Sequence, residues 1–129
     1  MTKHYLIHPD LSYKLNGIFF AIHNELGRLR SERQYADFLE ERLRQADVGY
    51  EREKETPIAV DGKLIKGNRV DYIIENKIVV ELKAKPFLAK SDFYQMLRYL
   101  ETAGLKLGLI VNFRRKYLRP KRIVNNRIP

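Results

Sequence analysis

The sequence contains no cysteine, and this absence excludes two classes of protein. A disulfide-stapled scaffold and a zinc site built on thiolates both need cysteine, whereas a chain without it suits a reducing cytoplasm. The chain also has no apolar run near the roughly 18 residues of a membrane span, and residues 1–6 lack the apolar segment of a secretory signal. We therefore expect a cytoplasmic protein with no membrane segment.

Internal repeats, low-complexity segments and linkers are also absent, so nothing in the sequence divides the chain into parts. Its 129 residues, of which 44% are hydrophobic, are enough to bury one modest core. We predict one domain that spans residues 1–129 and ends in a basic tail from about residue 114 to residue 129.

Acidic residues are missing from this tail, which holds seven Lys or Arg side chains in a chain of net charge +9. A basic surface favours polyanions through phosphate contacts and counterion release, although it also occurs on proteins that are merely soluble. Tyr117 lies among the cations, and an aromatic ring there suits base stacking. The predicted nucleic-acid contacts are Arg114, Arg115, Lys116, Arg119, Lys121 and Arg122.

Three stretches repeat apolar residues at helical spacing, and the stretches between them are rich in β-branched residues. The first helix is expected to begin at Asp10 or Ser12, and the third at Ser91. Ser31 opens the second, because Ser31 and Gln34 match a capping box. The pattern predicts an α/β fold in which helices flank a mixed central β-sheet. The predicted order is helix (11–26), helix (31–49), strand (50–60), strand (63–74), strand (78–85), helix (91–102), strand (105–113) and a short edge strand (123–124).

Charged residues interrupt the two apolar strands around the turn at residues 75–77. Asp71, Glu81 and Lys83 lie inside these strands, where such side chains are disfavoured. Alternation places Glu81 and Lys83 on one face. A three-residue loop would pair Ile74 with Ile78 and set Asp71 opposite Glu81, whereas a two-residue loop would put the two carboxylates on opposite faces.

Two facing carboxylates would have Cβ atoms about 4.5–5.5 Å apart. At that distance they repel, and one of them would retain a proton unless a cation lies between them. Mg²⁺ prefers oxygen ligands and is commonly bound by one or two carboxylates together with substrate phosphate. Lys83 would then lie beside the ion and stabilise developing negative charge. The spacing of Asp71, Glu81 and Lys83 thus indicates metal-dependent phosphodiester cleavage.

Asp71 followed by Glu81-Leu82-Lys83 on a hairpin resembles the PD-(D/E)XK nuclease superfamily. Gln95 and Tyr99 resemble the Q-x3-Y element of its RecB-like branch. The order of residues 23–27, Glu32 with Tyr35, the hairpin, and residues 102–113 is similar to the small stand-alone GxxExxxR proteins of that superfamily. Leu29 and Ala36 stand where that motif has its first Gly and its Arg. The resemblance implies a restriction-endonuclease-like core.

The resemblance also implies roles for particular residues. The catalytic set would be Asp71, Glu81, Lys83, Gln95 and Tyr99. The metal ligands would be Glu32, Asp71, Glu81 and the carbonyl of Leu82, with Glu25 as the alternative to Glu32. The expected ion is Mg²⁺ or Mn²⁺, the expected partner is DNA, no small-molecule cofactor is expected, and related proteins of this size often form homodimers.

Three functions follow from these observations. The first is a metal-dependent deoxyribonuclease. The second is a catalytically inactive nucleic-acid-binding module that retains the nuclease fold, which the altered turn at Gly27 to Leu29 allows. The third is a protein-interaction subunit whose basic tail binds an acidic partner. Binding of Mg²⁺ or Mn²⁺ separates the first from the second, and binding of DNA at low salt separates both from the third.

Overall fold

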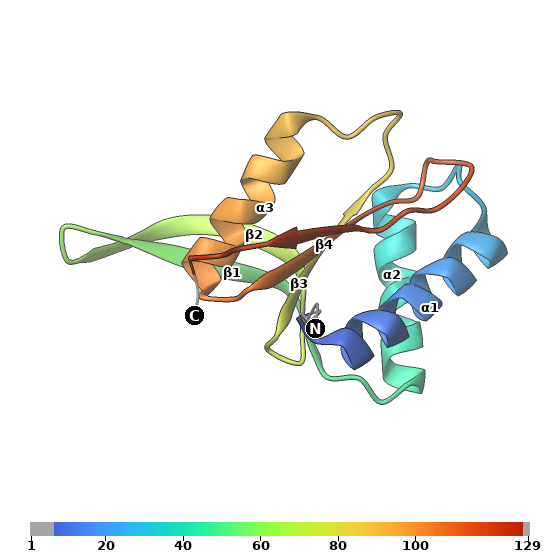
Figure 1. Ribbon diagram of the computed structural model, residues 1–129, viewed down its shortest axis with the longest axis horizontal. Coiled ribbons are helices and arrows are strands. Elements are labelled where there is room, and N and C mark those ends of the chain that lie inside the picture. Colours follow the sequence, from blue (N-terminus) through green and yellow to red (C-terminus); the bar gives the residue numbers. More distant parts are fainter. Residues whose placement is uncertain (1–6, 128–129) are drawn as a thin grey trace, which may run out of the picture.

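A computed structural model describes residues 7–127, apart from the side chains of Thr56 and Asn68. Residues 1–6 of the N-terminal stretch lie outside this range. The chain forms α1 (Pro9–Leu26), α2 (Glu32–Gln45), β1 (Tyr50–Val60), β2 (Lys63–Ile74), β3 (Ile78–Lys83), α3 (Lys90–Ala103), β4 (Leu107–Asn112) and β5 (Lys121–Val124) (Figure 1). No helix in the described part of the chain is long and apolar enough to cross a membrane.

The strands form a five-stranded sheet in the order β1-β2-β3-β4-β5. β3 and β4 are parallel, and the other neighbours are antiparallel. The parallel pair arises because α3 connects the two strands, as a crossover helix must. The predicted α/β fold with a mixed sheet is therefore confirmed, and the predicted edge strand is β5.

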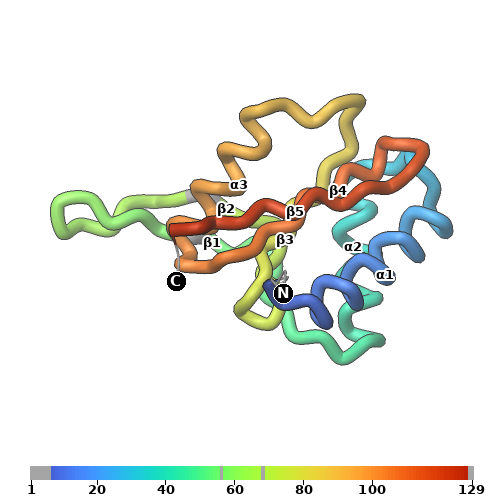
Figure 2. Tube along the Cα trace, viewed as in Figure 1, coloured from blue at the N-terminus to red at the C-terminus, as the bar shows by residue number. Residues whose placement is uncertain are grey.

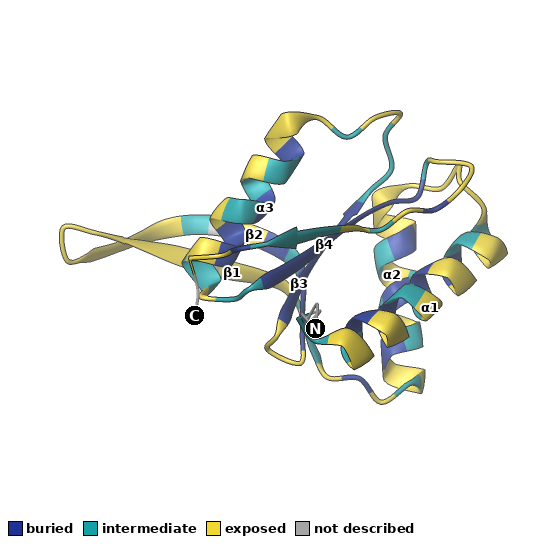
Figure 3. Ribbon diagram, viewed as in Figure 1, coloured by how far each residue is buried: buried dark blue, intermediate teal, exposed yellow. Residues whose placement is uncertain are grey.

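Helices cover both faces of the sheet, and each face has its own hydrophobic core (Figure 3). α1 and α2 pack on the face formed by alternate residues such as Val80, Leu82 and Leu109. α3 packs on the opposite face through Met96, Tyr99 and Leu100, against residues that include Val79 and Ile110. β4 is buried along its whole length, as its continuous apolar run predicts. Glu81 and Lys83 share the face of Val79, so they lie on the α3 side.

Glycine permits the close approach of α3 to β4. A Cβ atom built on Gly108 would lie 2.3 Å from the Met96 sulfur, which is well inside contact distance. Gly108 is part of β4, and Met96 is fully buried on α3. The absence of a side chain at this one position of β4 thus sets how closely α3 covers the sheet.

The β1–β2 hairpin extends beyond the rest of the molecule (Figure 2). Val60 pairs with Lys63, so the connection is the two residues Asp61 and Gly62. Both have positive φ, 50° and 75°, which is the backbone that a two-residue type I′ turn needs. Pro57 interrupts the ladder of β1, where the register shifts, and β1 is an edge strand that tolerates the missing N–H.

The start of two helices differs from the prediction. Neither Asp10 nor Ser12 caps α1, because the Ser12 hydroxyl donates to the carbonyl of Pro9, inside the helix. α3 begins at Lys90 rather than at Ser91, and the Asp92 carboxylate accepts the N–H of Ala89 at 2.7 Å. The predicted caps at Asp10, Ser12 and Ser91 are therefore wrong: α1 has no side-chain cap, and in α3 the Asp92 carboxylate takes this place.

The second helix begins as predicted but ends earlier. The Ser31–Gln34 capping box is confirmed. α2 stops at Gln45, whereas Gly49 was the predicted end. Asp47 adopts a φ of 56°, and the N–H of Val48 donates to the carbonyl of Leu43. This is the closure of a left-handed helix end, which Asp can adopt without glycine.

Candidate active site

The turn between β2 and β3 has the three-residue length that sets the two acidic residues opposite each other. Ile74 pairs with Ile78, and residues 75–77 form the loop. Glu75 and Asn76 have φ of 52° and 56°, and the N–H of Lys77 donates to the carbonyl of Ile74. Of the two loop lengths considered, the structure has the three-residue loop, so the two carboxylates approach each other rather than point to opposite faces.

Asp71 and Glu81 meet where the ladder between β2 and β3 opens. The last paired residues are Tyr72 and Val80. Beyond them the N–H of Asp71 donates to Glu81 Oε1 at 2.8 Å, and the N–H of Leu82 donates to Asp71 Oδ2 at 2.8 Å. Each carboxylate thus occupies the place of a carbonyl from the neighbouring strand, and the two side chains converge with Glu81 buried and Asp71 half-buried.

The environment of these two groups favours their protonated forms. Burial, and then the negative charge of Asp71, raise the pKa of Glu81 to about 8. Burial also raises the pKa of Asp71, although the N–H of Leu82 opposes the shift. Without a cation the pair therefore retains a proton near neutral pH. A set of oxygen atoms with this charge conflict fits a hard divalent ion such as Mg²⁺.

The backbone of Leu82 and the side chain of Glu32 border the pair. The N–H of Leu82 points to Asp71, and in a strand the carbonyl of the same residue faces the same edge. Glu32 Oε2 accepts the N–H of Ala84 at 3.3 Å, and its charge contributes to the raised pKa of both acids. Within residues 7–127 no three His, Cys, Asp or Glu side chains are close enough to share an ion. Asp71, Glu81 and the Leu82 carbonyl could hold one together.

Glu25 lies apart from this pair. Its carboxylate forms an ion pair with Arg42 of α2, between the two helices on the other face of the sheet. Arg42 thus neutralises the charge of Glu25 away from the site. Glu32, in contrast, directs its carboxylate toward the end of β3. Of the two glutamates considered as a third acid, the structure places Glu32 beside the pair.

Asp92 holds the side chain of Lys83. Lys83 Nζ lies 3.7 Å from Asp92 Oδ1, and Lys85 Nζ lies 2.7 Å from Oδ2. Burial raises the pKa of Asp92, but the hydrogen bonds from Lys85 and Ala89 outweigh it, so the pKa falls below its usual value. Asp92 is therefore an anion shared by two lysines. Sequence reasoning missed it, since an acid in the first turn of a helix signals only a favourable interaction with the helix dipole.

The segment after β3 is fixed by β4. Asn112 Nδ2 donates to the Lys85 carbonyl at 2.8 Å, and Asn112 Oδ1 accepts the Lys85 N–H at 3.1 Å. The N–H of Phe113 donates to the Lys83 carbonyl at 2.9 Å. Arg114 Nη2 donates to the Ala84 carbonyl at 3.1 Å. These bonds extend the pairing beyond the sheet and orient the backbone that carries Lys83. In the sequence, the feature that could have identified Asn112 is that it is a single amide side chain at the end of an apolar strand.

Tyr99 and Gln95 lie on α3, one turn apart. Tyr99 is buried against the sheet, and burial, followed by the charges of Glu81 and Asp71, raises its pKa to about 12. Its hydroxyl thus stays neutral close to the carboxylate pair. Gln95 is half-buried, and its spacing from Tyr99 puts it on the same side of the helix.

Glu53 of β1 is a fourth acid that sequence reasoning missed. The register of β1 on β2 sets it opposite Asp71, and its charge contributes to the raised pKa of Asp71. Its φ of 55° is uncommon for a residue in a strand. Glu53, Asp71, Glu32, Arg33, Ala36 and Arg52 line a cavity of about 110 Å³. Nothing local in the sequence distinguishes Glu53 from the other charged residues of β1.

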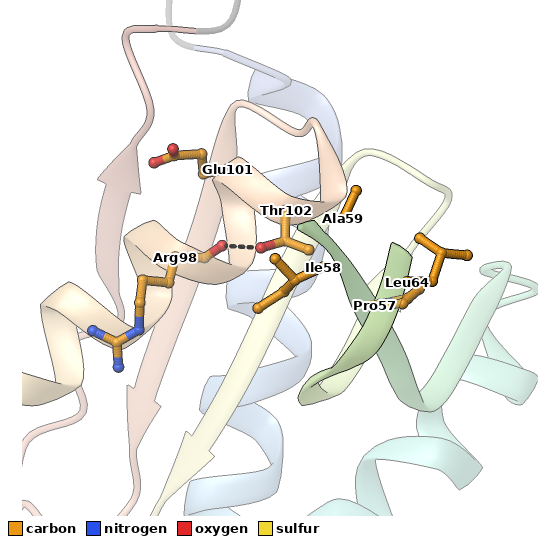
Figure 4. A pocket seen from close by; sticks show the side chains of 7 residues that line it. All are labelled: Pro57, Ile58, Ala59, Leu64, Arg98, Glu101 and Thr102. Carbon is orange, nitrogen blue, oxygen red and sulfur yellow. Dashed lines mark hydrogen bonds between the residues drawn. The ribbon is translucent and has the colours of Figure 1, made fainter. Parts of the chain in front are cut away.

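A larger cavity of about 420 Å³ lies elsewhere, between the β1–β2 hairpin and α3 (Figure 4). Its walls are Pro57, Ile58, Ala59, Leu64, Arg98, Glu101 and Thr102, and Thr102 donates to the carbonyl of Arg98 within α3. None of the predicted catalytic residues lines it. The predicted catalytic side chains therefore lie at the open end of the β2–β3 hairpin and not in the larger cavity.

The predicted nucleic-acid contacts divide into two groups. Arg114 binds the Ala84 carbonyl, and Arg122 donates to Ser12 Oγ and to the Ile7 carbonyl, each at 3.1 Å. These two guanidinium groups make contacts inside the protein. The exposed members are Arg115, Lys116, Arg119 and Lys121.

Comparisons with known proteins agree with this geometry. The family model of the PD-(D/E)XK nuclease superfamily matches residues 9–124. A search of curated proteins found no match. Among solved structures, the crystal structure of SSO0001 is similar, with 30% sequence identity and a TM-score of 0.55. The similarity covers 70% of this chain and 48% of that chain, so this chain spans about half the length of SSO0001.

The family match tests the fold predicted from the hairpin motif. It extends from the first turn of α1 to the end of β5, and it includes the helices on both faces as well as the β2–β3 hairpin. The predicted restriction-endonuclease-like core is confirmed, and nucleases of this kind generally use divalent metals. Because the match covers nearly the whole chain, this chain belongs to the PD-(D/E)XK nuclease superfamily.

Proposed function

We propose that this protein is a nuclease that hydrolyses phosphodiester bonds in DNA with the help of Mg²⁺ or Mn²⁺. The observation that supports the proposal is the convergence of Asp71 and Glu81 in a gap where both have raised pKa values. In the metal-free protein, two carboxylates this close repel each other and destabilise the fold, and a bound cation would remove that repulsion.

Asp71, Glu81 and the Leu82 carbonyl would hold the ion, with Glu32 beside them as a further acid. A bound divalent ion polarises a phosphoryl oxygen and lowers the pKa of water. The carboxylate pair would release its shared proton when the ion binds. Most of the metal's remaining ligands would be water and the substrate phosphate.

Lys83 would supply positive charge where the phosphate gains negative charge as the water attacks. Its ammonium can donate to a phosphate oxygen because Asp92 lies at 3.7 Å and leaves donors free. The neutral hydroxyl of Tyr99 and the amide of Gln95 would donate to the substrate phosphate from α3. The exposed cations Arg115, Lys116, Arg119 and Lys121 would hold the DNA backbone without reading its sequence. A cytoplasmic location and a homodimer stay predictions.

The test compares cleavage and binding in the same proteins. Lys83→Ala and Asp71→Asn should each abolish Mg²⁺-dependent cleavage of DNA while they leave DNA binding intact. Lys63→Ala and Asp10→Asn are matched controls, because both residues are exposed and lie outside the site. Cleavage that persists in both site variants would refute the proposal.

A second function is the inactive DNA-binding module. The observation that favours it is that no three His, Cys, Asp or Glu side chains within residues 7–127 are close enough to share an ion, while Glu32 accepts the N–H of Ala84. Calorimetry decides between the two functions. A module would bind DNA but give no heat with Mg²⁺ or Mn²⁺.

A further inference from the structure

Two loops leave the sheet at the edge where the candidate site lies. Residues 84–89 follow β3, and residues 113–120 follow β4. Because β3 and β4 are parallel, their carboxyl ends meet at one edge. The loops are also joined directly, since the Asn112 side chain binds both backbone groups of Lys85 and Arg114 binds the Ala84 carbonyl. Figure 1 shows both at the upper right of the molecule.

Each loop exposes an aromatic ring. Phe87 is 80% exposed and Tyr117 is 70% exposed, so both rings offer most of their surface to a partner. The two loops contain Lys85, Arg114, Arg115, Lys116 and Arg119 and no acidic residue. The ammonium of Lys116 lies 5.5 Å from the centre of the Tyr117 ring. Exposed rings among cations indicate a partner that offers both flat apolar surfaces and negative charge.

An unpaired nucleic-acid strand has this combination. Its bases have free faces that stack on aromatic rings, and its phosphates contact cations. In a duplex, neighbouring base pairs cover each other's faces, so the rings would reach only the base edges that are exposed in the grooves. The first loop begins directly after Lys83, so a strand held by these loops would pass the carboxylate pair.

We propose that the two loops bind a single-stranded segment of nucleic acid, with Phe87 and Tyr117 stacking on its bases. This inference rests on the proposed nuclease function, because it specifies the form of the substrate that reaches Asp71 and Glu81. It assigns the exposed cations of the same loops to the phosphates of that strand. A duplex would be a substrate where it carries an unpaired end or gap.

The experiment measures binding without cleavage. Fluorescence anisotropy in EDTA compares a labelled oligothymidylate with a blunt duplex of equal length, using the full chain. Phe87→Leu and Tyr117→Leu remove one aromatic ring each and keep an apolar side chain. Tyr13→Leu is the matched control, because Tyr13 is 82% exposed on α1. A vesicle of anionic lipid is the third probe, since exposed rings and cations also occur on membrane-binding surfaces.

The wild-type protein should bind the oligothymidylate more tightly than the duplex. Each loop variant should lose at least about fivefold in affinity for the single strand, the lower end expected for one stacked base, and little for the duplex. Unchanged binding in both variants, equal losses for strand and duplex, or vesicle binding that depends on Phe87 would overturn the inference. Failure of the nuclease proposal would appear differently, as intact strand binding without cleavage in Mg²⁺.

Discussion

At the scale of single residues, charge conflict rather than packing distinguishes the site. Asp71 and Glu81 each accept a backbone N–H from the opposite strand, and these contacts hold two carboxyl groups close together where both cannot easily ionise. An apolar pair at these positions would continue the ladder without such a cost. The carboxylate pair therefore makes the metal-free protein less stable than an apolar pair would, as expected at a site that binds a cation.

The raised pKa of Glu81 predicts how stability depends on pH in the metal-free protein. Because the folded state binds the proton more tightly than the unfolded state, this contribution to stability is present at low pH. It should decrease as the pH rises from the ordinary Glu pKa of about 4.3 toward about 8. Glu81→Gln, which cannot ionise, should flatten this decrease.

Urea unfolding across that pH range, in EDTA, checks the prediction. Glu41→Gln is the control, because Glu41 is exposed on α2 and should leave the profile unchanged. Equal pH slopes for the wild-type protein and Glu81→Gln would show that Glu81 titrates normally.

Asp92 should act through Lys83. Asp92→Asn removes the anion that Lys83 and Lys85 share, so the lysine beside the site loses its fixed position. Misplaced catalytic groups lower the rate of the chemical step, and we expect kcat to fall about tenfold or more with little change in KM. Steady-state cleavage assays with the folded fraction measured by circular dichroism provide the test. Glu101→Gln is the control on the exposed side of α3. A loss confined to stability would assign Asp92 a structural role alone.

At the scale of elements, the distance between α3 and β4 sets how close Gln95 and Tyr99 of α3 lie to the carboxylate pair. Gly108→Ala would place a Cβ atom against the Met96 side chain and push α3 away from the sheet. We expect the free energy of unfolding to fall by about 1–3 kcal/mol, the usual cost of overpacking.

Gly17→Ala is the matched control for this change. Nothing lies within 4 Å of a Cβ atom at Gly17, which is inside α1, so alanine there should stabilise the protein by about 0.5–1 kcal/mol. Chemical denaturation of both variants gives the comparison. If Gly108→Ala were as well tolerated as Gly17→Ala, the packing of α3 on β4 would be looser than described.

At the scale of the whole molecule, sequence reasoning succeeded where the determining contacts are local. The period-2 strands, the turn at residues 75–77 and the capping box at Ser31 each depend on neighbouring residues, and each is present in the structure. Asp92 and Asn112 could not be found in this way, since their roles arise when α3 and β4 pack beside the end of β3. Glu53 is opposite Asp71 only because of the register of β1.

The central claim is that Asp71 and Glu81 share one divalent cation. Calorimetric titration of Mn²⁺ into the purified protein tests it most directly, with Asp71→Asn as the site variant and Asp10→Asn as the control. We predict saturable binding of one ion per chain in the wild-type protein and the control, and its loss in Asp71→Asn. Binding that survives unchanged in Asp71→Asn, or no binding by the wild-type protein, would contradict the account.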